Sequence, residues 1–229
     1  MEKVISHLNE LRSRLISTIV IFLLFFTLFS FLSRYLIKYL LSSLPKGIEI
    51  VVMTPMESLF GILKVSIFVS ILATLPFALY HIVRFVKPAL KKNERKFLKF
   101  LPFSLTLFFV GFFCCYFLLI RIFIPFFVRI SSVLNVRNLW SLVSTIDFIF
   151  MSCVIFGLFF QLPLLLLILE KIGIVNYGVL RKQRKTVYVL VFIFSAVITP
   201  TVDPITQIVV SVPLILLYEI SLILMKLIK

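Results

Sequence analysis

The sequence predicts an all-α polytopic membrane protein with six transmembrane helices, and three observations support this fold class. Of its 229 residues, 62% are hydrophobic and only 14% are charged, whereas soluble domains are near half apolar and a quarter charged. The apolar residues gather in six segments, most of them near the length of about 20 residues that crosses a bilayer. The Lys and Arg residues behind the net charge of +15 concentrate in the short connections between these segments.

We expect a single transmembrane domain over residues 1–229 that contains all six helices. Their expected ranges are 5–33, 62–84, 98–122, 145–169, 185–200 and 204–226. The fifth is anomalous, because the 14 apolar residues between Lys185 and Pro200 extend only about 21 Å as a helix. We therefore expect this helix to stop short of the far interface, or the bilayer to thin around it.

The distribution of basic residues predicts the orientation. Of the 24 Lys and Arg residues, 17 lie on the side of the amino terminus and 7 on the opposite side. Cytoplasmic loops carry the excess of Lys and Arg, so both termini are expected in the cytoplasm (N-in, C-in), as six helices require.

Prolines predict that several helices bend. They stand inside or near the second, third, fourth and sixth segments, at Pro76, Pro102, Pro163 and Pro213. Each removes a backbone hydrogen bond. Bent helices cannot close into a straight bundle, so we expect a curved or open arrangement.

The sequence excludes several classes of function. It contains no metalloprotease, nucleophile-elbow or phosphate-loop motif, so it is not expected to be an enzyme and no cofactor is expected. Cys114, Cys115 and Cys153 fall inside apolar runs without metal-ligand spacing, which is typical of small buried hydrophobic residues. Nucleic-acid binding is not expected either, because the positive charge is explained by membrane orientation.

An acidic residue stands among basic ones just before the first apolar segment, in HLNELRSRL. On a helix, Lys3, His7, Glu10 and Arg14 form one polar stripe beside an apolar one. Glu10 and Arg14 are then one turn apart, and such a pair is worth about a few tenths of a kcal/mol. Glu10 could equally bind an external cation, and spacing alone leaves both interpretations open.

The loop between the second and third helices repeats this pattern. It carries seven Lys and Arg residues and one acid, Glu94, between Arg84 and Lys99. Most such loops only set orientation. A carboxylate among cations stays ionised, however, and could accept a guanidinium group through two hydrogen bonds.

Four polar residues lie within or near the membrane. Gln161 stands deep in the fourth helix, where its amide needs partners in the same chain or in the helix of another subunit. Asp203 and Gln207 lie at the turn after the short fifth helix, which implies a wet recess or a partner. Glu219 lies toward the cytoplasmic end of the sixth helix.

Five segments together resemble the TatC family, the large subunit of the twin-arginine protein translocase. They are HLNELRSRL, TPMESLFGILK, LPFALYHIVRFVKPALKKNERK, FGLFFQLP and ITPTVDPITQIVVSVPLILLYEIS, in the order in which the family has its own motifs. The resemblance covers nearly the whole chain. It implies a curved, glove-like six-helix fold with short helices 5 and 6.

The resemblance also implies the function and its residues. Members of the family bind twin-arginine signal peptides at the cytoplasmic face, assemble with small single-span TatA and TatB-type subunits into a multimeric complex, and export folded proteins by using the proton-motive force. The positions implied for signal-peptide binding are Glu10, Leu11, Arg12, Arg14, Phe85, Pro88 and Glu94. Those implied for contact with partner subunits are Gln161, Asp203, Gln207 and Glu219. Besides these partners the chain contacts membrane lipid, and the membrane implied is the prokaryotic cytoplasmic membrane, with an organellar membrane as the second choice.

Two positions depart from the family pattern. Many relatives carry a glutamate at the position of Gln161, so no charged role is expected there, and Arg121 falls where apolar residues or proline are usual. The main alternative function is a small secondary transporter, which would require central ionisable residues and internal symmetry that this sequence lacks. An intramembrane enzyme and a purely structural scaffold are further alternatives.

Overall fold

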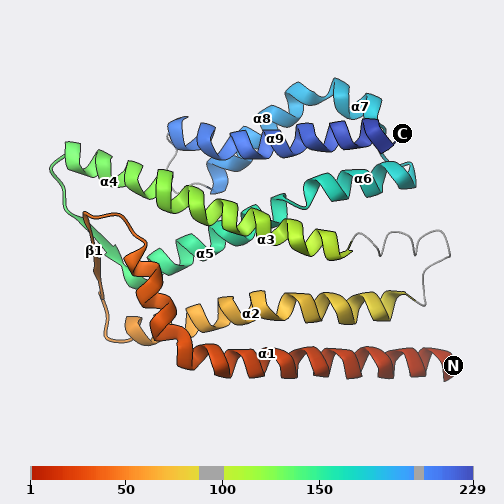
Figure 1. Cartoon of the computed structure of the whole chain (residues 1–229), viewed down its shortest axis with the longest axis horizontal. Coiled ribbons are helices and arrows are strands. Elements are labelled where there is room, and N and C mark those ends of the chain that lie inside the picture. The colour runs from red at the N-terminus through yellow and green to blue at the C-terminus, as the bar shows by residue number, and fades with distance from the viewer. Residues whose placement is uncertain (1, 88–100, 199–203, 229) are drawn as a thin grey trace. The chain divides into compact units, whose positions relative to one another are not determined.

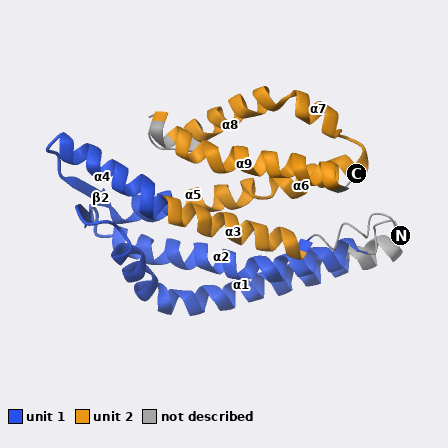
Figure 2. Ribbon diagram, turned by 45° about the horizontal axis from the view of Figure 1, so that its top comes forward, with its two compact units in different colours: residues 1–101, 119–150 blue, residues 102–118, 151–229 orange. Residues whose placement is uncertain are grey.

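The structure is a computed structural model that describes residues 2–87, 101–198 and 204–228. Helices make up most of it, and the chain divides into two compact units (Figures 1 and 2). Unit 1 comprises Met1–Leu101 and Leu119–Phe150, and unit 2 comprises Pro102–Leu118 and Met151–Lys229.

Unit 1 is built on two long helices, α1 (Glu2–Ser42) and α2 (Glu57–Val86), which lie side by side in opposite directions (Figure 1). The rings of Phe25 on α1 and Phe77 on α2 lie 5.9 Å apart between centroids. The buried positions of α2 carry mostly small residues, such as Gly61 and Ser66. Small side chains let neighbouring helices approach closely where lipid removes most of the hydrophobic driving force between helices.

The outer end of unit 1 differs most from the sequence prediction. The first helix is expected to end near residue 33, but α1 continues to Ser42, and its last turns leave the line of its first part in Figure 1. A short strand, β1 (Ile48–Val51), follows α1. It pairs in parallel with a distant strand, β2 (Asn138–Ser141), from Ile48↔Asn138 to Val51↔Ser141. No pattern in the sequence predicts this small sheet.

The third predicted helix is longer than expected: the sequence predicts its end at residue 122, but the chain stays helical to Val133. Helix α3 (Leu101–Leu118) is followed by a π-helical turn, η2 (Leu119–Phe123), and by α4 (Ile124–Val133). The turn precedes Pro125, whose ring removes one backbone donor, and a widened turn accommodates that loss. Arg121 lies exposed in this turn, inside the helical stretch.

Unit 2 contains most of α3 and the last part of α5 (Leu142–Phe159), with α6 (Leu162–Ile172), α7 (Tyr177–Lys182), α8 (Arg184–Ile198) and α9 (Pro204–Ile228). Its core includes Tyr218, Leu222 and Met225 of α9, against which side chains of α6, α7 and α8 pack. α3 and α5 approach closely at two glycines. A Cβ atom on Gly111 would lie 2.5 Å from the ring of Phe160, and one on Gly157 would lie 2.7 Å from that of Phe108.

Helix lengths agree with a polytopic membrane protein. Five helical stretches are long and apolar enough to cross a membrane, namely Asn9–Ser42, Glu57–Val86, Leu101–Val133, Leu142–Ile172 and Gln207–Leu227. The predicted fifth helix, α8, has 15 residues and spans only about 22 Å, as expected.

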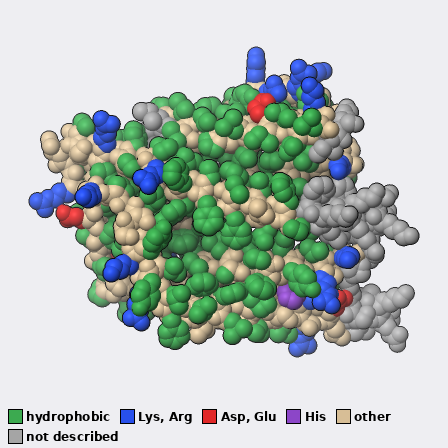
Figure 3. Space-filling view, viewed as in Figure 1, with side chains coloured by type: hydrophobic (Ala, Val, Ile, Leu, Met, Phe, Trp, Pro, Cys, Tyr) green, Lys and Arg blue, Asp and Glu red, His purple; other side chains and the backbone are tan. Residues whose placement is uncertain are grey.

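The sixth predicted helix, expected over residues 204–226, is α9, and its membrane-spanning stretch is the shortest of the five named above. Helix α9 has 25 residues, and Pro213 lies inside it without ending it. The sequence around this proline contains no glycine at which the helix could stop. Apolar side chains cover the middle of the helices on the face seen in Figure 3, and the Lys and Arg side chains lie mostly near helix ends.

Candidate functional site

The first candidate site lies at the end of unit 1 that carries the amino terminus of α1 and the carboxyl terminus of α2. We call this the cytoplasmic end, as the distribution of basic residues predicts, and the opposite end the outer end. Nε of Arg14 donates a hydrogen bond to Oε1 of Glu10 at 3.1 Å, and Nη2 forms an ion pair with the same oxygen. The sequence interpretation as an i,i+4 pair on one helix therefore agrees with the geometry.

Arg14 also connects α1 to α2. Its Nη1 donates to the backbone carbonyl oxygen of His81 at 3.3 Å. The Arg14 side chain is 16% exposed, whereas that of Glu10 is 38% exposed. Arg14 is thus held between the two helices, and the side chain of Glu10 is the more exposed of the two.

The other predicted signal-peptide residues surround this pair only in part. Leu11 is half-buried beside Glu10, and Arg12 is exposed on α1. Phe85 lies half-buried one turn beyond His81 on α2. Pro88 and Glu94 lie outside the described residues. The structure therefore brings together the α1 part of the predicted site and the end of α2.

The intramembrane amide of Gln161 has both its polar atoms paired within unit 2. Its Oε1 accepts a hydrogen bond from Oγ of Ser104 at 2.6 Å, and its Nε2 donates to the backbone carbonyl oxygen of Ser104 at 2.9 Å. Gln161 itself stands at the short break between α5 and α6, just before Pro163. A partner for this amide was expected, but a serine 57 positions away on α3 had no signal in the sequence.

The remaining intramembrane polar residues pair across the α8–α9 hairpin. Nε2 of Gln207 donates to the carbonyl oxygen of Phe192 at 2.8 Å. The Glu219 carboxylate accepts hydrogen bonds from Nη2 of Arg184, at 2.8 Å, and from the hydroxyl group of Tyr188. Asp203 lies outside the described residues. Gln161, Gln207 and Glu219 thus each connect separate helical segments of unit 2.

Glu57 is a residue that the sequence reasoning did not single out. It is the only charged side chain that is buried among the described residues, with 6% exposed. Its carboxylate accepts hydrogen bonds from the backbone N–H of Met53, from the hydroxyl group of Ser141 and, at 3.3 Å, from the N–H of Val143. It therefore connects the start of α2 to the end of β2 and the start of α5. A carboxylate at a helix amino terminus is a favourable arrangement. Two of its partners, Ser141 and Val143, are more than 80 positions away in sequence.

No arrangement typical of a metal centre is found in residues 2–87, 101–198 and 204–228, where no group of three His, Cys, Asp or Glu side chains could hold an ion. The thiol groups of Cys114, Cys115 and Cys153 are free, and Cys115 and Cys153 are buried. The described sites can therefore bind a partner through ion pairs and hydrogen bonds.

Comparison with known proteins decides the family. The sequence profile described as "Sec-independent protein translocase protein (TatC)" matches residues 6–213. The chain belongs to the TatC family. The Aquifex aeolicus Sec-independent protein translocase protein TatC is 34% identical over 226 residues, which cover 96% of this chain and 93% of that protein. A chloroplastic relative from Pisum sativum is 33% identical over 94% of this chain and 61% of its own length.

Solved structures of the TatC family share the fold. A crystal structure described as the twin arginine translocase receptor TatC superimposes with a TM-score of 0.75 at 33% identity, covering 96% of this chain and 98% of that one. This likeness confirms the predicted all-α polytopic fold class. The chain is thus a multi-pass membrane component of the Sec-independent, twin-arginine translocase, which is a transport system.

Proposed function

We propose that this protein is the signal-peptide receptor of its translocase. In this proposal the carboxylates of Glu10 and Glu94 bind the two arginines of a twin-arginine signal peptide at the cytoplasmic face. Leu11, Arg12, Arg14, Phe85 and Pro88 form the surroundings of the two carboxylates. The membrane is the prokaryotic cytoplasmic membrane, and the proton-motive force drives the export of folded cargo.

One observation supports the proposal: the carboxylate of Glu10 already binds a guanidinium group, that of Arg14, through two donors that share its Oε1. The carboxylate is the more exposed member of the pair. An incoming arginine can therefore approach Glu10 from solvent, while Arg14 remains anchored to the carbonyl oxygen of His81. A carboxylate prefers arginine over lysine at such a site, since guanidinium offers two parallel donors and ammonium is a point charge.

We also propose that small single-span TatA and TatB-type subunits assemble with this protein through its intramembrane polar residues, Gln161, Asp203, Gln207 and Glu219. Within unit 2, Gln161, Gln207 and Glu219 already have partners. A helix of a small subunit would therefore have to share these hydrogen bonds or replace them. An amide or carboxylate oxygen has more than one lone pair, so sharing is chemically possible.

The receptor proposal is tested by peptide binding to the detergent-purified protein. A twin-arginine signal peptide and its twin-lysine counterpart are titrated against wild type, Glu10→Gln and Glu94→Gln. We expect wild type to prefer the arginine peptide, and each substitution to weaken its binding by roughly tenfold or more, as for a lost charged hydrogen bond.

Glu170→Gln is the matched control, because Glu170 is another acidic residue at the end of a helix, α6, and its loss changes the net charge equally. Its binding should remain at the wild-type level. Equal affinity for both peptides, or equal weakening in the control, would contradict the proposal and reduce Glu10 to a helix-surface ion pair.

A further inference from the structure

A hollow at the outer end of unit 1 combines positive charge with an apolar wall. Its volume is about 610 Å³, within the range of ligand sites, and it lies between the last turns of α1 and the starts of α2 and α5. The α1 side contributes Arg34 and Lys38, which are one helical turn apart and therefore on one face. Neither the receptor function nor the pairs described above involve this hollow.

The two cations have no acidic partner among the residues that the structure describes. Arg34 lies over the ring of Tyr35, with its guanidinium carbon 5.7 Å from the ring centroid. Both side chains are exposed. The hydroxyl group of Ser58 also lines the hollow and can donate to an oxygen anion, whereas that of Ser42 donates to the carbonyl oxygen of Tyr39 at 2.8 Å.

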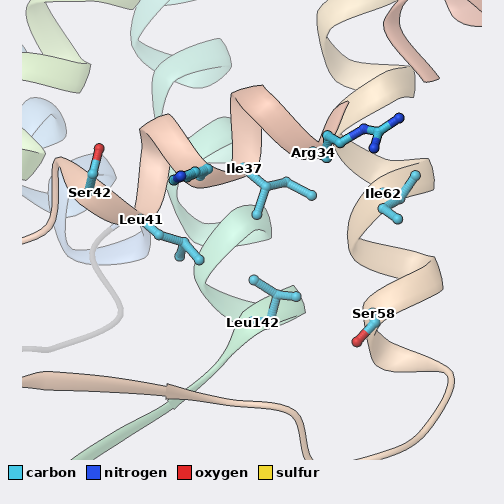
Figure 4. A pocket seen from close by; sticks show the side chains of 8 residues that line it. Arg34, Ile37, Leu41, Ser42, Ser58, Ile62 and Leu142 are labelled. Atoms are coloured by element: carbon cyan, nitrogen blue, oxygen red, sulfur yellow. The ribbon is translucent and has the colours of Figure 1, made fainter. Parts of the chain in front are cut away.

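Apolar side chains complete the hollow (Figure 4). Ile37 of α1 points toward Ile62 of α2, and Leu41 of α1 points toward Leu142 of α5. Arg34 lies at one end of this row and Ser42 at the other. A ligand that fits must therefore carry both an anionic group and a hydrocarbon part.

The position along α1 indicates where such a ligand resides. Arg14 and Arg34 are 20 residues apart on one helix, a rise of about 30 Å, which equals the thickness of the hydrocarbon core. With Arg14 at the cytoplasmic interface, Arg34 lies at the level of the opposite headgroups. Basic residues are depleted on the outer side of membrane proteins, so two adjacent ones facing a single hollow need a local reason.

We propose that this hollow binds the headgroup of an anionic phospholipid of the outer leaflet. Arg34 and Lys38 hold the phosphate, the Ser58 hydroxyl group donates to one of its oxygens, and an acyl chain lies against the apolar wall of Ile37, Leu41, Ile62 and Leu142. The occupant is a lipid and not a soluble anion, because the apolar wall would otherwise stay exposed to water at the interface.

Thermal unfolding of the delipidated, detergent-solubilised full chain tests this site. The additions are phosphatidylglycerol, the zwitterionic phosphatidylcholine, and inorganic phosphate. A ligand that binds only the folded state raises Tm as its concentration rises. We expect phosphatidylglycerol to raise Tm for wild type, and the other two to have less than half of that effect.

The test variant is Arg34→Gln with Lys38→Gln, and the matched control is Lys46→Gln with Arg137→Gln, two exposed outer-side cations that do not line the hollow. The control should keep the phosphatidylglycerol shift, and the test variant should lose at least half of it. Native mass spectrometry of the same samples counts bound lipids and gives an answer even where a variant is less stable.

Three results would overturn the proposal. Equal shifts of Tm with both phospholipids would show that the site does not distinguish an anionic headgroup from a zwitterionic one. An equal shift with inorganic phosphate would indicate a soluble-anion site. Equal loss in the test and control variants would indicate a general surface-charge effect.

Discussion

Single side chains in this protein gain their roles from the groups that surround them. Glu10 and Arg14 are one turn apart on α1, an arrangement that is common and worth little on an exposed helix. Here Arg14 is largely covered and also donates to α2, so the pair is fixed in place, with Glu10 as its more exposed member. Fixed orientation, rather than the strength of the pair, is what makes Glu10 suited to select a guanidinium group.

Glu57 is expected to stabilise unit 1. Replacing it with glutamine puts an amide N–H₂ group where three donors now point at carboxylate oxygens, so at least one donor loses its acceptor. We expect Glu57→Gln to lower the Tm of the purified protein measurably.

Glu49→Gln serves as the control, because Glu49 is an exposed acid on the neighbouring strand β1. It should leave Tm near the wild-type value. If Glu57→Gln and Glu49→Gln unfold at the same temperature as wild type, the buried carboxylate has no structural role.

At the scale of helices, close approach depends on two glycines of unit 2. Gly111→Ala would place a methyl group 2.5 Å from Cγ and 2.8 Å from Cβ of Phe160. The Cβ atom cannot move without the backbone, so the helices must separate. We expect a loss of about 1–3 kcal/mol in the free energy of unfolding, as for overpacked cores, despite the better helix propensity of alanine.

Gly178→Ala is the matched control within unit 2, since no atom lies within 4 Å of its added Cβ. Denaturant unfolding of both variants measures the difference. A Gly111→Ala variant that is as stable as Gly178→Ala would contradict the close packing of α3 against α5.

The sequence predicted the long helices well, because lipid imposes an apolar length on each that can be counted. It also predicted the Glu10–Arg14 pair, whose spacing is local. It did not predict the sheet of β1 and β2, since two four-residue strands that pair over 90 positions leave no periodic pattern. The partners of Glu57 and Gln161 were missed for the same reason: Ser141 and Ser104 are distant in sequence and ordinary in type.

At the scale of the whole molecule, the same helices carry the candidate binding sites and the polar pairs that stabilise the fold. Unit 1 carries the candidate receptor residues at one end, and the buried Glu57 and the proposed lipid site at the other, joined by α1 and α2. In unit 2, the polar residues within the membrane pair with one another or with backbone groups, so they stabilise the fold before any subunit binds. Membership of the TatC family assigns this framework to protein export, and the receptor role remains our proposal.

The most direct measurement of that role locates a bound signal peptide on the protein. A twin-arginine peptide that carries a photo-crosslinking residue beside the arginine pair is irradiated with the purified protein, and the adducts are mapped by mass spectrometry. We predict adducts in residues 9–15 of α1 and near Phe85 of α2, with a twin-lysine peptide giving far fewer. Adducts at the outer end, around Trp140, or equal labelling by both peptides would contradict the account.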